Sequence, residues 1–168
     1  GYFPTPAALA DRLVAEAEIE PGMGVLEPSA GSGSLVEAVE RAHPDVRVEC
    51  VEWNHSLREL LELKGYKLVG RDFLELDKVG YDRVLMNPPF EKLQDIAHIE
   101  HAIELLSPGG RLVSIASAGV EYRADKKTEE FRRRIAELGG RVERLPAGSF
   151  KSSGTSVGTV VVIVDAPN

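Results

Sequence analysis

Short apolar segments alternate with helical segments along this chain, and this alternation limits the possible fold more than any other feature. Strands are expected at about residues 24–27, 46–51, 66–69, 81–86, 111–116, 141–145 and 157–164. Helices are expected from apolar residues spaced three or four apart, at about residues 6–20, 34–43, 54–64, 93–106 and 126–138. This order predicts a parallel α/β sheet with helices on both faces. The last two strands have no helix between them, so one of them should run antiparallel.

Composition sets the outer bounds. A chain of 168 residues with 43% hydrophobic content fits one domain, residues 1–168, with an ordinary core. The only cysteine, Cys50, lies in an alternating strand and is expected to be a packed thiol, as in a reducing cytoplasm. No apolar run reaches membrane-spanning length, so no membrane partner is expected. The net charge of −7 argues against non-specific binding to polyphosphates, and the only expected positive patch lies between Arg123 and Arg134.

The tetrapeptide Asn87-Pro88-Pro89-Phe90 follows an expected strand and therefore lies at the carboxyl edge of the sheet. Two consecutive prolines fix φ at about −65° and remove two backbone donors, which makes a stiff corner. Asn87 offers an amide oxygen, Pro88 leaves its carbonyl oxygen available, and Phe90 can present an aromatic face. These groups suit the exocyclic amine of a planar base. A turn with a buried phenylalanine would explain the tetrapeptide equally well.

Three earlier strand ends carry polar groups at the edge where open parallel sheets bind ligands. The loop from Glu27 to Gly33 lacks the phosphate-loop pattern, and a carboxylate beside backbone amides suits a zwitterion with an ammonium group. Glu52 follows Gly33 by 19 residues, a spacing typical of a carboxylate that binds ribose hydroxyls. Asp72-Phe73 could accept from an amino group and pack on a heterocycle, or could be a helix cap followed by a core ring.

Together these motifs resemble the class I S-adenosylmethionine-dependent methyltransferases, specifically the amino-methyltransferases, including the N6-adenine DNA methyltransferases. The opening Tyr2-Phe3-Pro4-Thr5-Pro6 is similar to the segment that covers the methionine part of the cofactor in the DNA enzymes. The resemblance implies a Rossmann-like, doubly wound, mostly parallel seven-stranded sheet with an antiparallel last strand. It assigns S-adenosyl-L-methionine to these residues: Tyr2, Phe3, Thr5, Pro6, Glu27, Pro28, Ser29, Ala30, Gly31, Gly33, Glu52, Trp53, Asp72, Phe73 and Asn87.

The resemblance also implies catalytic roles for Asn87, Pro88, Pro89 and Phe90. A flipped base would stack on Phe90, while the Asn87 side-chain oxygen and the Pro88 carbonyl accept from its amine and keep the nitrogen electron-rich. No metal is needed. Phe150 lies where the family's second base-contacting aromatic residue falls, and Phe90, Phe150 and Lys151 form the expected substrate-binding group.

Three amines share this motif: N6 of adenine in DNA, N2 of guanine in ribosomal RNA, and a glutamine amide in a protein. The opening segment favours DNA, and Phe90 stands where glutamine methyltransferases usually carry tyrosine. Such DNA enzymes generally have a recognition domain, and no residues after Asn168 could form one. We therefore expect a specificity partner or a longer natural chain. A non-catalytic cofactor-binding subunit is the alternative of a different class.

Two further expectations concern single side chains. Thr5 is expected to cap a helix whose first residue is Pro6. The four histidines are expected to lie on the surface, because no cysteine or carboxylate cluster completes a metal-ligand set around them. They are His43, His55, His98 and His101.

Overall fold

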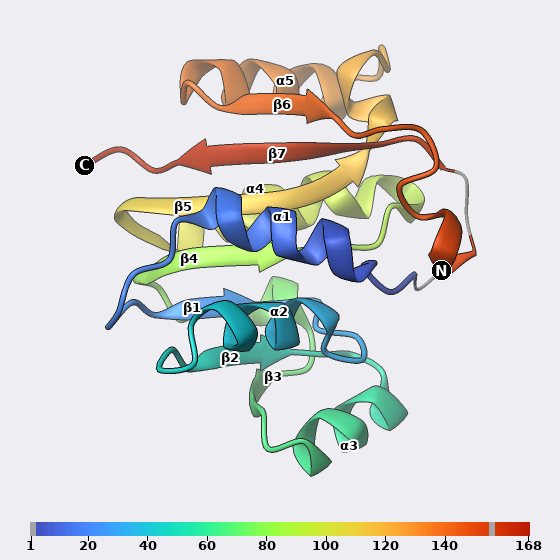
Figure 1. Cartoon of the computed structure of the whole chain (residues 1–168). Coiled ribbons are helices and arrows are strands. Elements are labelled where there is room, and N and C mark those ends of the chain that lie inside the picture. The colour runs from blue at the N-terminus through green and yellow to red at the C-terminus, as the bar shows by residue number, and fades with distance from the viewer. Residues whose placement is uncertain (1–2, 155–156) are drawn as a thin grey trace.

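A single sheet in the order β3-β2-β1-β4-β5-β7-β6 runs through the computed structural model, which describes residues 3–154 and 157–168 (Figure 1). The strands are β1 (Val25–Glu27), β2 (Val48–Val51), β3 (Lys67–Gly70), β4 (Tyr81–Met86), β5 (Leu106–Ser117), β6 (Arg141–Arg144) and β7 (Thr159–Asp165). Strands β1 to β5 pair in parallel, whereas β7 pairs antiparallel with both β5 and β6. The seven-stranded sheet with an antiparallel last strand is therefore confirmed.

Helices cover both faces of this sheet (Figure 1). They are α1 (Ala7–Ala17), α2 (Ser34–Ala42), α3 (His55–Leu63), α4 (Gln94–Leu105) and α5 (Lys126–Glu137), with short 3-10 turns η1 (Phe73–Glu75), η2 (Glu91–Leu93), η3 (Ala118–Glu121) and η4 (Lys151–Ser153). Buried residues of α1 and α2 form one core, and those of α4 and α5 form the other. In β4, Leu85 faces the first core while Val84 and Met86 face the second, as the two-residue period of a strand requires. Cys50 is fully buried, which confirms the packed thiol.

Two local expectations need correction. Thr5 does not cap α1: Pro6 is the N-cap residue and no side chain makes a cap hydrogen bond there. Strand β5 begins at Leu106, five residues earlier than its expected start, because the ladder with β4 continues on both sides of an irregularity. The backbone nonetheless turns within this segment at Gly109, whose φ of +75° favours glycine. By contrast, Asn54 does cap α3, because its side-chain oxygen accepts from the Leu57 amide at 3.0 Å.

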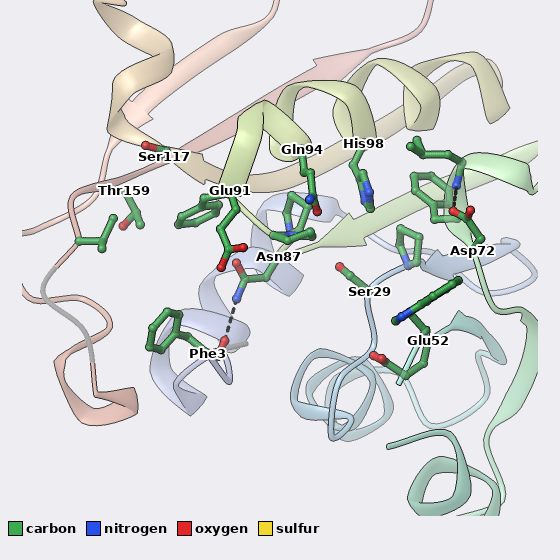
Figure 2. A pocket seen from close by; sticks show the side chains of 18 of the residues that line it. Phe3, Ser29, Glu52, Asp72, Asn87, Glu91, Gln94, His98, Ser117 and Thr159 are labelled. Carbon is green, nitrogen blue, oxygen red and sulfur yellow. Dashed lines mark hydrogen bonds between the residues drawn. The ribbon is translucent and has the colours of Figure 1, made fainter. Parts of the chain in front are cut away.

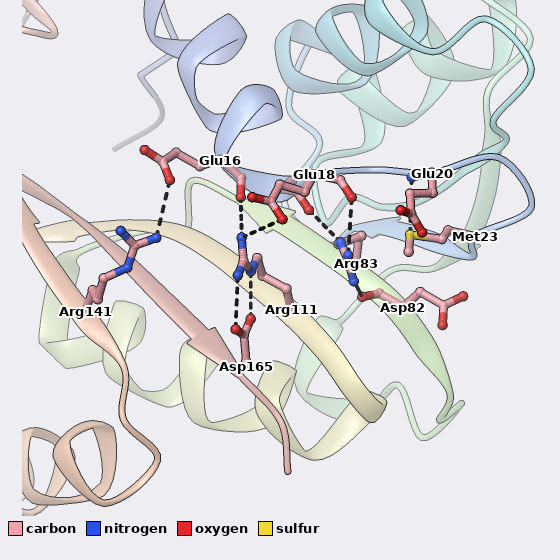
Figure 3. Close-up of polar contacts among 10 residues, drawn as sticks. Glu16, Glu18, Glu20, Met23, Asp82, Arg83, Arg111, Arg141 and Asp165 are labelled. Carbon is pink, nitrogen blue, oxygen red and sulfur yellow. Dashed lines mark hydrogen bonds and ion pairs between the residues drawn. The ribbon is translucent and has the colours of Figure 1, made fainter. Parts of the chain in front are cut away.

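The carboxyl end of α1 is tied to the sheet by two arginines (Figure 3). Arg83 of β4 donates to the carbonyl oxygens of Ala17 at 2.5 Å and Glu18 at 3.2 Å. Arg111 of β5 donates to the Glu16 carbonyl at 2.8 Å and pairs with Asp165 through two nitrogens. These bonds satisfy carbonyl groups that a helix end leaves without partners. They therefore fix how α1 lies on β4 and β5, the two strands whose far ends reach the site described below.

No helix among residues 3–154 and 157–168 is long and apolar enough to cross a membrane.

Replacing Arg83 with methionine should lower the free energy of unfolding by about 1–2 kcal/mol, because the Ala17 and Glu18 carbonyl groups lose their charged donor. Urea denaturation followed by circular dichroism would measure the change. Arg47→Met, at an exposed position, provides the matched control and should alter stability by less than about 0.5 kcal/mol. Equal effects of the two substitutions would show that the tie to α1 contributes nothing.

Candidate functional site

A cavity of about 840 Å³ opens at the carboxyl edge of the sheet, between the strand ends and the start of α4 (Figure 2). Its volume is in the range of pockets that take a small organic ligand. The lining residues are Phe3, Pro28, Ser29, Glu52, Trp53, Arg71, Asp72, Phe73, Leu74, Asn87, Pro88, Pro89, Phe90, Glu91, Gln94, His98, Ser117, Phe150, Val157 and Thr159. Segments far apart in the sequence thus meet at one edge, as the parallel topology predicts.

The side-chain amide of Asn87 has a fixed orientation. Its Nδ2 donates to the Phe3 carbonyl oxygen and to Thr5 Oγ1, both at 3.2 Å. Because a carbonyl oxygen can only accept, the nitrogen must lie on this side, and Oδ1 is on the opposite side of the amide (Figure 2). The opening segment therefore presents the Asn87 oxygen as an acceptor. Thr5 is buried, and its hydroxyl serves this contact instead of a helix cap.

The backbone amides of the first loop are largely used within the protein. The amide of Ser29 donates to Glu27 Oε2 at 2.9 Å, and that of Gly31 donates to Glu52 Oε1 at 2.7 Å. The amide of Gly33 donates to the Ala30 carbonyl at 2.9 Å. The expectation that bare amides of this loop face a ligand is therefore wrong for these three. The Ser29 and Gly31 amides instead orient two carboxylates, that of Glu27 in this loop and that of Glu52 after β2.

Glu52 lies at the cavity wall with both carboxylate oxygens anchored. Oε1 accepts from the Gly31 amide and Oε2 from the Asn54 amide, each at 2.7 Å. Each carboxylate oxygen has a second lone-pair site, so the group can still accept two hydrogen bonds from vicinal hydroxyls. Two charge-assisted bonds hold the side chain in place before any ligand arrives.

Glu27 lies deeper, in a narrow recess next to the cavity that Phe3, Thr5 and Asn87 also line. Its side chain is only 2% exposed. Burial raises its pKa well above the usual value, and the nearby Glu52 charge raises it further, while hydrogen bonds from Ser29 oppose these effects. A cation entering this recess would remove the cost of ionising Glu27.

The third strand end has the cap and the core ring that the sequence left open as one alternative. Asp72 Oδ1 caps η1 by accepting from the Leu74 amide at 3.0 Å, and Phe73 is a core residue with 2% exposure. Both residues nevertheless line the cavity. Asp72 can therefore accept from a ligand through its second oxygen while the first holds the turn.

Most of the expected site residues meet at this edge, and some do not. The cavity or its recess is lined by Phe3, Thr5, Glu27, Pro28, Ser29, Ala30, Glu52, Trp53, Asp72, Phe73, Asn87, Pro88, Pro89, Phe90 and Phe150. Gly31 contributes through the hydrogen bond that its backbone amide donates to Glu52. Four expected residues line neither space: Pro6, the N-cap of α1; Gly31; Gly33, where a Cβ atom would lie 3.1 Å from the Tyr66 ring; and Lys151, which is exposed. Tyr2 lies outside the described residues.

Sequence reasoning missed a row of polar side chains on α4. Gln94 and His98, four residues apart on one helix face, both line the cavity (Figure 2). The expectation of surface histidines holds fully only for His55, because His43, His98 and His101 are half-buried. His98 is half-buried and packs against Phe73 with ring centroids 5.5 Å apart, and His101 binds the Leu76 carbonyl at 2.7 Å. The sequence does carry one indication of this: Gln94 and His98 are four residues apart in the helix that directly follows Asn-Pro-Pro-Phe.

The far wall of the cavity depends on a fully buried carboxylate. Asp95 Oδ2 accepts from the Ser117 amide at 2.9 Å, and Ser117 lines the cavity at the end of β5. Burial raises the pKa of Asp95, although backbone hydrogen bonds and the Arg123 charge act in the opposite direction. This contact ties the start of α4 to the end of β5, at the wall opposite Glu52.

Among residues 3–154 and 157–168, no group of three or more histidine, cysteine, aspartate or glutamate side chains is arranged to hold a metal ion.

Comparison with protein families gives one match that spans most of the chain. The methyltransferase small domain model matches residues 7–137. Among curated relatives, ribosomal RNA small subunit methyltransferase C of Shewanella pealeana is 29% identical over 119 residues, which cover 64% of this chain and 35% of that protein. Modification methylase CviBIII of Paramecium bursaria Chlorella virus NC1A is 31% identical over 98 residues, covering 54% and 26%. The chain thus spans about a third or less of the length of these two relatives.

Solved structures share the fold at low identity. A type I restriction-modification system superimposes with a TM-score of 0.78 at 21% identity, covering 99% of this chain and 42% of that one. The 16S rRNA N2 G1207 methyltransferase of Thermus thermophilus, solved with AdoMet and guanosine, gives 0.65 at 20% identity, covering 95% and 39%. Both support the Rossmann-like sheet.

The raised pKa of Glu27 makes a prediction about stability and pH. At a pH below the usual glutamate pKa of about 4.3, native and unfolded chains both hold this proton and the cost of ionising it is absent. As pH rises above that value, the unfolded chain gives up the proton first, so the free energy of unfolding falls until the raised native pKa is passed. Glu27→Gln should therefore lose less stability than the wild type between pH 5 and pH 8.

Urea denaturation at the two pH values would measure this difference. Glu62→Gln, at an exposed position of α3, is the control and should follow the wild type. A wild-type pH slope in Glu27→Gln would show that Glu27 is ionised in the native protein at the lower pH.

Proposed function

The chain belongs to the methyltransferase small domain family, whose cofactor is S-adenosylmethionine, and we propose that it moves the cofactor's methyl group to N6 of adenine in DNA. One observation carries the chemistry: the Asn87 amide is held with its nitrogen against Phe3 and Thr5 and its oxygen free to accept at the Asn-Pro-Pro-Phe corner. An amine placed there can donate to the Asn87 oxygen and to the Pro88 carbonyl.

The residues of the cavity fit the cofactor. Glu52 has the remaining lone pairs for two ribose hydroxyls, and Asp72 has one carboxylate oxygen for the adenine amino group. The buried Glu27 recess suits the ammonium of the methionine part, because that charge would offset the cost of ionising this carboxyl group. Trp53 and Phe73 supply apolar surface at the same end of the cavity. The cofactor supplies an electrophilic methyl group on a sulfonium centre.

The chain's own residues position the acceptor amine. Phe90 is half-buried against the core and presents its ring to the cavity, so a planar base can stack on it. The Asn87 oxygen and the Pro88 carbonyl accept the two amine hydrogens, which keeps the nitrogen lone pair directed at the methyl group. Catalysis then rests on positioning and on fixed dipoles, without a covalent enzyme intermediate.

Several features support adenine in DNA over the other amines. The opening segment, which resembles that of the DNA enzymes, touches Asn87 directly. Phe90 and the buried Phe150 both line the cavity and suit a flat base extruded from a duplex. With a net charge of −7, the chain would depend on a partner or further domain for tight binding to DNA and for choice of sequence. The modification methylase among its relatives is consistent with this substrate.

Guanine N2 in ribosomal RNA is the second candidate. The curated relatives include a small-subunit ribosomal RNA methyltransferase, and one structural neighbour was solved with guanosine. The amine corner itself would accept either base, since both present an exocyclic amine on a planar ring.

Methyl transfer to separate pools tests the proposal. Protein incubated with radiolabelled S-adenosylmethionine and DNA, ribosomal RNA or protein should label DNA, and nuclease digestion should yield N6-methyladenine. Label in RNA as N2-methylguanine would replace the proposed substrate by the second candidate. Label found only in protein would exclude both nucleic-acid readings.

Asn87→Ala serves as the catalytic control in the same assay. It should lower transfer on the order of 10²-fold. Calorimetric binding of S-adenosylhomocysteine should stay within about threefold of the wild type, because Glu27, Glu52 and Asp72 remain. An equal loss of binding and transfer would place Asn87 in the cofactor contact rather than at the amine.

Thr5 should act as a positioning residue for Asn87. Thr5→Val keeps the shape but removes the acceptor oxygen, so the amide is held by the Phe3 carbonyl alone and kcat should fall roughly fivefold to tenfold with little change in KM for the cofactor. Thr5→Ser restores an acceptor and should recover most of the rate. Failure of serine to rescue, with both variants equally stable to heat, would assign Thr5 a packing role only.

A further inference from the structure

His98 is a polar side chain at the cavity wall, and no hydrogen bond with residues 3–154 or 157–168 accounts for its position there. It lies on α4 and points into the cavity between Gln94 and Asp72 (Figure 2). Its Nδ1 is sealed from solvent and has no hydrogen-bond partner among the described residues. His101, one turn further along α4, differs because its Nε2 is already bound to the Leu76 carbonyl. His98 is thus available to a ligand, whereas His101 holds the protein together.

The surroundings of His98 fix which nitrogen carries its proton. A proton on Nδ1 would leave a buried donor without an acceptor, which costs more than leaving a lone pair there. The proton therefore belongs on Nε2, the ring nitrogen left to meet a ligand in the cavity. Burial lowers the pKa of His98 and His101 lowers it further, while Asp72 opposes them, so the ring is neutral at physiological pH. His98 therefore presents one N–H donor, at Nε2, to the cavity.

Next to this donor, the end of β3 presents an acceptor and an aromatic ring. Asp72 has one carboxylate oxygen engaged by the Leu74 amide and the other available. Phe73 packs between the two histidines, with ring centroids 5.5 Å from His98 and 4.9 Å from His101, which holds the His98 ring at a set angle. A donor and an acceptor side by side match one edge of adenine, where an amino group lies next to a ring nitrogen that accepts.

We propose that His98 reads the adenine ring of the cofactor by donating its Nε2–H to a ring nitrogen next to the 6-amino group, while Asp72 accepts from that amino group. The inference rests on the proposed function only for the identity of the cofactor. It makes His98 a specificity-determining residue on α4, the helix that follows the amine corner. The same helix would then align the cofactor's base and the acceptor amine, because Gln94, four residues earlier, lines the cavity beside that corner.

Three substitutions separate this role from packing. His98→Gln keeps a donor near the Nε2 position, His98→Asn keeps one near the Nδ1 position, and His98→Phe keeps only the ring. Calorimetry with S-adenosylhomocysteine should give wild-type-like affinity, within about threefold, for the glutamine variant. Affinity should fall roughly fivefold to twentyfold for the other two. His55→Asn, an exposed histidine of α3, is the control and should bind as the wild type does.

Analogues of S-adenosylhomocysteine that lack N1 or N7 of adenine identify the acceptor atom. One of the two deaza compounds should bind wild-type protein roughly tenfold more weakly than the parent, and His98→Phe should bind that compound and the parent equally well. Thermal melts of each variant verify folding, and the asparagine variant carries the test if the phenylalanine variant does not fold.

Wild-type affinity in both the asparagine and the phenylalanine variants would overturn the proposal. The proposal would also be overturned if His98→Phe still bound the deaza compound more weakly than the parent, by the same factor as the wild type. The outcome is separate from that of the proposed function: normal transfer to DNA with unchanged binding in the His98 variants defeats the inference alone. Histidine-dependent binding without transfer to any amine defeats only the proposed function. Absence of cofactor binding by the wild type would defeat both.

Discussion

Helix α1 is attached near one end to Arg83 of β4 and near the other end to Asn87, which directly follows β4, and the arrangement of the site depends on this pair of contacts. Within β4, Arg83 donates to the carbonyl groups at the carboxyl end of α1. Just after the carboxyl end of β4, the side-chain amide of Asn87 is held by the residues that precede α1. Because Arg83 and Asn87 belong to one short stretch of extended chain, the distance between the two attachments is nearly fixed. A shift of α1 along the sheet would therefore turn the Asn87 amide.

The two buried carboxylates of the site, Glu52 and Glu27, differ in how well the protein stabilises them. Glu52 is held by two amide donors, so its position is set before a ligand binds. Glu27 has only 2% exposure and a raised pKa, so its ionised form is unfavourable in the native protein. A ligand that carries a positive charge would relieve that cost. Part of the binding energy for such a ligand thus comes from removing an unfavourable feature of the free protein.

The fold could be predicted because it follows from local patterns, whereas much of the site follows from contacts between distant segments. Strand β4 was placed correctly because both of its faces are buried, so that Val84, Leu85 and Met86 form a continuous apolar run. Thr5 was assigned to a cap because capping is a local rule, yet its actual partner lies 82 residues away. The first loop was expected to offer free amides, but carboxylates from two strand ends already bind them. His98 was expected on the surface, whereas the packing of η1 against α4 places it at the cavity.

The attachment of α1 also has a consequence for the order in which the chain folds. The contacts of Arg83 with Ala17 and of Asn87 with Phe3 join residues 66 and 84 positions apart. Such distant contacts form slowly, since a long loop must close before either bond is made. A nascent chain that ends before β4 already contains Glu27, Glu52 and helix α2, against which α1 packs, but it lacks Arg83 and Asn87. The carboxylates of the site are therefore synthesised early, and the oriented amide is completed only when β4 returns to the first helix.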